Sequence, residues 1–260
     1  MKKYFLLWLK VTIQITQVAF ASRIGVVLFT FGKIIRFVFF LVFLFLITSR
    51  TNSLAGYTVW QVILFFLTFN VIDIIAQFLW RDVYRFRSYI VSGNFDMILT
   101  KPISPLFRSL FGGSDILDLL TLFPLIGFLI YVTFQIGGVG FFDVLLYILL
   151  VINGLLISLA FHIFVLALGI VTTEVDNAIW MVREITQLGR FPIRIYPKAI
   201  TFAFTYVVPV AAMIYFPTQA LLGILSVQGI IISVLFSIGF LLLSLYSWRG
   251  ALRKYASASS

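Results

Sequence analysis

The side chains that could carry out chemistry are few, and three of them lie in strongly apolar surroundings. Asp73, Asn153 and His162 stand inside long hydrophobic runs, and Asn153, Ser158 and His162 follow the spacing of one helix face. An ionisable group inside a membrane span costs roughly 2.5–3.5 kcal/mol, which makes such a residue a candidate for function. One interpretation is that Asp73, Asn153 and His162 line a transport pathway or an interface between subunits. The alternative is that they hydrogen-bond to one another or to neighbouring backbone carbonyls.

Catalytic and metal chemistry find little support in the sequence. It contains no cysteine, which excludes disulfides, thiolate metal sites and cysteine nucleophiles. His162 is the single histidine, so a His/Glu metal cluster cannot form, and no GxSG segment supplies an intramembrane serine nucleophile. The phosphate-binding pattern GxxxxGK[ST] is also missing from the sequence. We therefore expect a chain that is not an enzyme and that binds no cofactor itself.

The composition indicates a protein whose solvent is lipid. Hydrophobic residues make up 62% of the 260 residues, charged residues 11%, and the mean hydropathy is +1.13. A soluble domain is nearer half apolar and one quarter charged. The sequence therefore predicts an all-α polytopic membrane protein forming a single domain, 1–260. Six segments approach the length of about 20 residues that a span requires: 33–49, 58–80, 113–135, 143–171, 199–216 and 229–248.

The basic residues are distributed unevenly around these predicted spans. Of the 19 Lys and Arg residues, all except Arg50 fall on one side of the membrane in this assignment. The positive-inside rule then places both termini and the two long loops, 81–112 and 172–198, in the cytoplasm. The formal net charge of +10 is thereby explained without a nucleic-acid partner.

The N-terminal segment 1–30 is predicted to be an amphipathic helix in the membrane interface. Lys3, Lys10, Gln14 and Gln17 recur on one helical face, and apolar residues occupy the others. The alternative is a cleaved signal peptide, because MKK precedes apolar residues and AFA resembles a cleavage site. The polar residues from position 10 onward interrupt the apolar stretch that a signal peptide needs, so the interfacial helix is favoured.

The first long loop contains the polar stretch SGNFDMILTKPISP, residues 92–105. Gly93 is suited to end a helix in the left-handed conformation, and Asn94 can cap a second short helix. Pro102 and Pro105 end that helix, because proline disfavours helix at the residue before it. The pattern predicts a helix, a corner and a second helix below the membrane surface. This unit is either a solvated linker or an element that docks a cytoplasmic partner.

The second long loop reads TTEVDNAIWMVREITQLGRFPIRIYPK and mixes charged with apolar residues. Gly189 is expected to end a helix on the membrane surface, and the proline-stiffened segment after it leads into the fifth span. Its candidate contacts are Glu184, Arg190 and Pro192. The alternative is a surface helix held by lipid headgroups.

The chain resembles a known family in its six spans and in three segments between them. These segments are SGNFDMILTKPISPLF after the second span, GRFPIRIYP before the fifth and YVVPVAAMIYFPTQALLG after it. The family that the chain resembles in this way is the ABC-2 type permease family. The resemblance implies the membrane half of an ATP-driven exporter in the plasma membrane of a prokaryote. It implies pairing with a second copy or a related permease, and two cytoplasmic ATPase subunits that bind the ATP and magnesium. PTQALLG is similar to the short re-entrant segment of that family on the outer side.

The resemblance also implies that the loop after the second span is the coupling helix, which sits in a cleft of the ATPase. The residues that it designates as contacts are Arg85, Phe86, Asp96, Leu99, Lys101 and Pro102. The alternative functions are an ATP-independent secondary transporter or channel, and a structural membrane protein. An aromatic content of 18% is compatible with a hydrophobic or cationic drug or a lipid as substrate, and equally with aromatic residues that face lipid.

Overall fold

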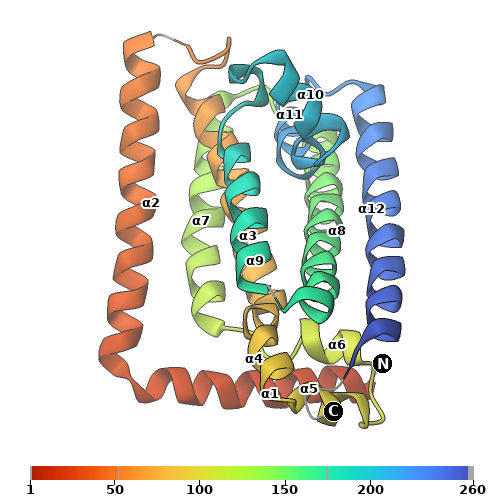
Figure 1. Ribbon diagram of the computed structural model, residues 1–260. Coiled ribbons are helices and arrows are strands. Elements are labelled where there is room, and N and C mark those ends of the chain that lie inside the picture. The colour runs from red at the N-terminus through yellow and green to blue at the C-terminus, as the bar shows by residue number, and fades with distance from the viewer. Residues whose placement is uncertain (1, 52, 174, 257–260) are drawn as a thin grey trace.

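The computed structural model describes residues 2–51, 53–173 and 175–256, and the regular elements among them are helices. Five long helices lie side by side as a bundle (Figure 1). All five are long and apolar enough to cross a membrane, which confirms the all-α polytopic class. They are α2 (Arg23–Thr51), α3 (Val59–Trp80), α7 (Ile116–Ile136), α8 (Phe141–Thr172) and α12 (Val227–Lys254).

Helix α1 (Lys2–Ala21) lies across one end of this bundle, nearly at right angles to the long helices (Figure 1). It passes the length and hydropathy test for a span, but its orientation is that of an interfacial helix. The helix ends before Ser22, and α2 starts at Arg23. The predicted boundary at residue 30 was therefore wrong, since 23–30 form the first turns of the first span.

The segment between α3 and α7 folds into four short helices beside α1, at the end of the bundle where both chain termini lie (Figure 1). We call this the terminal end and the opposite one the far end. The elements are the 3₁₀ turn η1 (Arg81–Arg85), α4 (Phe86–Val91), α5 (Asn94–Leu99) and α6 (Pro105–Leu110). Gly93 makes the corner between α4 and α5 with φ of 72°, as its left-handed preference predicts. The hydroxyl of Ser104 caps α6.

The segment 172–198 does not stay at one surface, and the prediction of a second cytoplasmic loop was wrong. Helix α9 (Val175–Gln187) runs along the bundle and packs on α8 (Figure 1), and the 3₁₀ turn η2 (Leu188–Arg190) packs on α3. The ring of Phe191 lies 5.7 Å from that of Phe40, near the middle of α2. Because α8 ends at the terminal end and α12 starts at the far end, the chain must pass from one end to the other in this region (Figure 1), and we interpret α9 with η2 as the start of this crossing. Helix α9 has 13 residues and is not itself long and apolar enough to count as a membrane span.

The predicted fifth span, 199–216, is instead part of a bent unit at the far end (Figure 1). It follows the 3₁₀ turn η3 (Ile193–Ile195) and comprises α10 (Lys198–Tyr206), the π-helix η4 (Ala211–Tyr215) and α11 (Phe216–Leu221). The two halves are bent by 78° at the break that contains Pro209. Because both halves lie at the far end (Figure 1), we interpret this unit as a re-entrant segment rather than a broken span. Arg194 and Lys198 consequently lie at the far end with Arg50.

Candidate functional site

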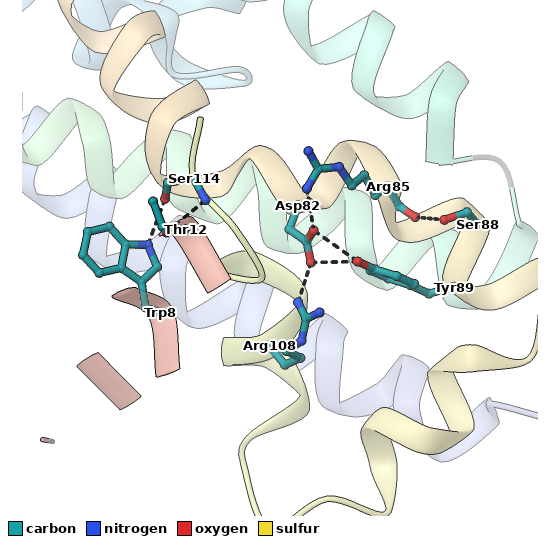
Figure 2. A network of polar contacts seen from close by, with 8 residues as sticks. All are labelled: Trp8, Thr12, Asp82, Arg85, Ser88, Tyr89, Arg108 and Ser114. Atoms are coloured by element: carbon teal, nitrogen blue, oxygen red, sulfur yellow. Dashed lines mark hydrogen bonds and ion pairs between the residues drawn. The ribbon is translucent and has the colours of Figure 1, made fainter. Parts of the chain in front are cut away.

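A buried carboxylate fixes the segment between α3 and α7 at the terminal end. The Asp82 side chain is 1% exposed and accepts hydrogen bonds from Arg108 at 2.8 Å, Arg85 at 3.5 Å and the Tyr89 hydroxyl at 3.2 Å (Figure 2). A Cβ atom at Gly112 would lie 1.7 Å from Asp82 Oδ2, so only glycine allows the chain to pass this close. Sequence reasoning missed this anchor, because the Arg108 guanidinium reaches it from a different helix.

An aromatic cluster attaches the same segment to α12. Phe86 and Phe95 are fully buried with ring centroids 5.2 Å apart, and the Trp248 ring lies 6.3 Å and 6.4 Å from them. The Tyr255 hydroxyl donates to Asp96 Oδ1 at 2.9 Å, and desolvation together with this carboxylate raises the pKa of Tyr255 to about 12. The prediction of Phe86 as a direct partner contact was wrong, because its ring fills the core. Asp96 is half-buried.

The outer face of α4 and α5 is apolar at its centre. Val91 is 59% exposed, Met97 65% and Leu99 37%, outside the spans at the terminal end. Arg85, Arg87, Lys101 and Pro102 are exposed on the same segment. Among the predicted contacts, Leu99, Lys101 and Pro102 are all exposed on this segment, and their role remains a prediction.

Helix α1 is fastened to this segment by polar contacts. The Trp8 indole donates to the Ser114 hydroxyl at 2.8 Å, and the Ser114 amide donates to the Thr12 hydroxyl at 3.4 Å (Figure 2). The Lys3 ammonium donates to the carbonyl of Pro102 at 3.2 Å. Helix α1 is therefore in direct contact with the segment between α3 and α7, which we call the candidate docking segment.

A second polar group lies inside the bundle, where α3, α8 and α9 meet. Asp73 and His162 both line a small cavity of about 30 Å³ between these helices. Asp73 accepts a hydrogen bond from Gln77 at 2.7 Å, and His162 Nδ1 lies 2.8 Å from the carbonyl oxygen of Ser158. Three guanidinium groups act on the charge of this carboxylate: Arg36, Arg183 and Arg190. The structure thus brings together two of the three candidate pathway residues.

Asn153 has a different environment from Asp73 and His162. Its side-chain amide donates to the carbonyl oxygen of Ser233 at 3.0 Å and to the Ser233 hydroxyl at 2.8 Å. It is buried between α8 and α12 and joins these two spans. For Asn153 the structure supports the alternative of a satisfied buried polar group.

The three candidates of the predicted second loop are not at the terminal end. Glu184 is exposed on the outer face of α9, whereas Pro192 is buried beyond η2. The Arg190 guanidinium lies 5.2 Å from the Phe40 ring centroid and 4.8 Å from that of Phe69. Their designation as cytoplasmic contacts was wrong, because the helix that carries them crosses the bundle.

These features define an all-helical, multi-pass membrane protein with a folded loop unit at one end and charged side chains in its interior. A sequence model of the family described as ABC-2 family transporter protein matches residues 34–259. The chain belongs to this family of membrane transport proteins. Neither the comparison with curated proteins nor that with solved structures finds a match.

Proposed function

We propose that this chain is the permease subunit of an ATP-driven exporter, and that a separate ATPase docks on the outer face of α4 and α5. ATP and magnesium are bound by that partner, two copies of which serve a pair of permeases. Family membership supports the permease role. The observation that carries the docking surface is the exposed apolar group Val91, Met97 and Leu99, which lies outside the spans.

This surface has the composition of a docking element. Large apolar side chains at the centre of an interface supply most of its binding energy, and charged residues around them set the orientation. Here Arg87 precedes and Lys101 follows the apolar group in the sequence, and both are exposed, so we expect a complementary cleft that is apolar with an acidic rim. Arg85 and Pro102 extend the same face.

The contacts of the docking segment provide a route for movement into the spans. Phe86 and Phe95 pack on Trp248 of α12, and Asp82 fixes the segment to Arg108 of α6. Arg87 pairs with Asp176 at 3.7 Å, near the start of α9. A displacement of α4 and α5 by the ATPase would therefore be passed to α12 and α9, and α9 carries Arg183, which lines the small cavity with Asp73 and His162.

The charge distribution supports a cytoplasmic terminal end. Among the basic residues, Arg50, Arg194 and Lys198 lie at the far end, and Arg36, Arg183 and Arg190 lie within the bundle. The remaining basic residues lie in or near the segments at the terminal end. By the positive-inside rule this end faces the cytoplasm, which suits an exporter in a prokaryotic plasma membrane.

An exposed charged face on α9 supports pairing with a second permease. Glu184 is exposed within this crossing, and Trp180 and Met181 are exposed beside it. Charged residues at membrane depth face other protein or a water-filled cavity rather than lipid. A second copy, or a related permease, would cover this face.

The docking proposal is tested by purifying the full chain with its associated ATPase from native membranes. We expect Leu99→Ser and Lys101→Glu to abolish ATPase association and vanadate-sensitive ATP hydrolysis, because both side chains are exposed on the docking face. Arg50→Glu makes the same charge change at the far end and is the control. Insertion and yield should be unchanged in all three variants. Retention of the ATPase by both docking variants would refute the proposal.

Pairing is tested by cross-linking, which is unambiguous because the natural chain has no cysteine. Met181→Cys should form a covalent adduct with the neighbouring permease, and Leu235→Cys on the outer face of α12 should not. Equal yields from the two positions would contradict the assignment of α9 as the interface.

A further inference from the structure

A larger cavity lies between α2, α3, α7 and η2, and none of the roles above uses it. Its volume is about 390 Å³, within the range of about 300–1,000 Å³ that is typical of ligand sites. Much of its wall is apolar, and the main residues are Phe37, Phe40, Phe66, Leu120, Pro124 and Leu125. Polar groups of Thr30, Asn70, Gln77 and Thr121 complete the lining.

The charged groups on this wall are mainly basic. Lys33, Arg36 and Arg190 line the cavity, and Asp73 is the acidic residue among its lining side chains. Lys33 forms an ion pair with Asp118, at the start of α7. The Nε atom of Arg190 is buried and has no hydrogen-bond partner in the described part of the chain.

The surrounding charges do not neutralise these cations. The charges of three arginines, Arg36, Arg183 and Arg190, act on Asp73, and Asp118 pairs with both Lys33 and Arg81. Glu184 adds one further carboxylate near Arg190. Five basic groups therefore face three acidic ones. Arg190 is partly buried and Arg36 is exposed, but both stand within the apolar spans. Because an unpaired cation at membrane depth is costly, this region favours one more anionic group.

Access to the cavity is lateral. Helix α2 forms one wall, yet of its 29 residues only Leu44 and Thr48 are buried. Most of the helix is exposed in this chain, so little packing within the chain must be broken for α2 to move aside. An amphiphile in the bilayer could enter between α2 and the remaining helices.

We propose that this cavity binds an anionic amphiphile, with its phosphate or carboxylate between Arg36 and Arg190 and its apolar body against Phe37, Phe66 and Leu125. The guanidinium groups would donate charge-assisted hydrogen bonds to the anion. The assignment of this ligand as the exported substrate rests on the proposed function, whereas the binding of the ligand does not depend on that proposal. The basic lining argues against the cationic substrate that the aromatic composition had left open.

The test uses the full chain in a non-ionic detergent, with radiolabelled dodecyl phosphate as the probe in a scintillation proximity assay. We expect saturable binding that dodecyltrimethylammonium and dodecanol fail to displace. Arg36→Gln and Arg190→Gln should each weaken binding about tenfold or more, the loss expected for one charge-assisted hydrogen bond. Arg50→Gln, outside the cavity, should bind like the natural protein.

A second variant separates loss of the site from loss of the fold. Thr121→Trp keeps every charge but fills the cavity from α7, and it should abolish binding while eluting as a monodisperse species. Equal displacement by the cationic and anionic amphiphiles, or undiminished binding by both Gln variants, would overturn the proposal.

The source of the anion is distinguished in nanodiscs. Competition by phosphatidylglycerol, relative to phosphatidylcholine, would identify the ligand as a membrane lipid, and unaltered binding would identify a free amphiphile. These measurements need no ATPase. A chain that binds dodecyl phosphate but recruits no ATPase would refute the proposed function alone, and one that recruits an ATPase but binds no anion would refute this inference alone.

Discussion

Replacement of Asp82 by asparagine should loosen the segment between α3 and α7 without unfolding the bundle. The substitution keeps the shape of the side chain but removes a charge that is 1% exposed and lies 2.8 Å from Arg108. Removal of one member of a buried ion pair costs about 3–5 kcal/mol. Because Arg108 retains 23% exposure, the lower value of about 3 kcal/mol applies. The more exposed Arg85 adds less than about 1 kcal/mol.

Hydrogen exchange is the assay that localises this loss. If the segment opens separately from the spans, a reduction of about 3 kcal/mol should accelerate amide exchange in residues 86–110 roughly a hundredfold. Exchange in the centres of α3 and α8 should not change. Reversible unfolding in mixed micelles gives the corresponding change in global free energy.

Asp176→Asn is the matched control, because its partner Arg87 lies 3.7 Å away and both side chains are more than half exposed. An exposed pair of this kind contributes about 0–1 kcal/mol. The double variant Asp82→Asn/Arg108→Gln should recover part of the loss, since it leaves no unpaired buried charge. Equal effects of Asp82→Asn and Asp176→Asn would show that the buried Asp82–Arg108 pair does not hold the segment in place.

Three further changes test the packing. Phe95→Ala removes a fully buried ring and should lower the free energy of unfolding by about 3–5 kcal/mol, measured by titration in mixed micelles. Gly154→Ala places a Cβ atom 2.4 Å from the carbonyl oxygen of Met213 and should shorten the thermal half-life, whereas Gly239→Ala has open space and should not. Because the folded-state pKa of Tyr255 is raised from 10.0 to about 12, its stabilising contribution is complete below pH 10 and is lost by about pH 12. Tyr255→Phe should remove that alkaline step from the stability profile.

The uniformly apolar spans could be located from the sequence to within a few residues. The predicted segments 58–80 and 143–171 correspond to Val59–Trp80 and Phe141–Thr172. The crossing that starts with α9 could not be found in this way. Arg183 points into the bundle and Glu184 outward, and charged residues at this density give the same pattern as a helix on the membrane surface. Only the packing of α9 on α8 and of η2 on α3 distinguishes the two cases.

In the candidate site too, features set by local sequence could be predicted and features set by tertiary contacts could not. The corner at Gly93 follows from local backbone preferences, and the structure confirms it. The burial of Phe86 depends on Trp248, which approaches from the last helix, and the role of Asp82 depends on Arg108. Tertiary contacts of this kind leave no periodic signal in a single sequence, and the cavity lined by Arg36 and Arg190 is hidden for the same reason.

The contacts of α1 constrain the order in which this protein is assembled. The partners of Lys3, Tyr4, Trp8 and Thr12 are separated from them by 99 to 106 residues of chain. At a synthesis rate of about 5–20 residues per second, the first helix is complete on the order of 5–20 s before its binding site exists. Until then only headgroups and acyl chains are available to hold it. The apolar and basic faces of α1 therefore hold the nascent chain at the membrane surface before they contact the rest of the folded protein.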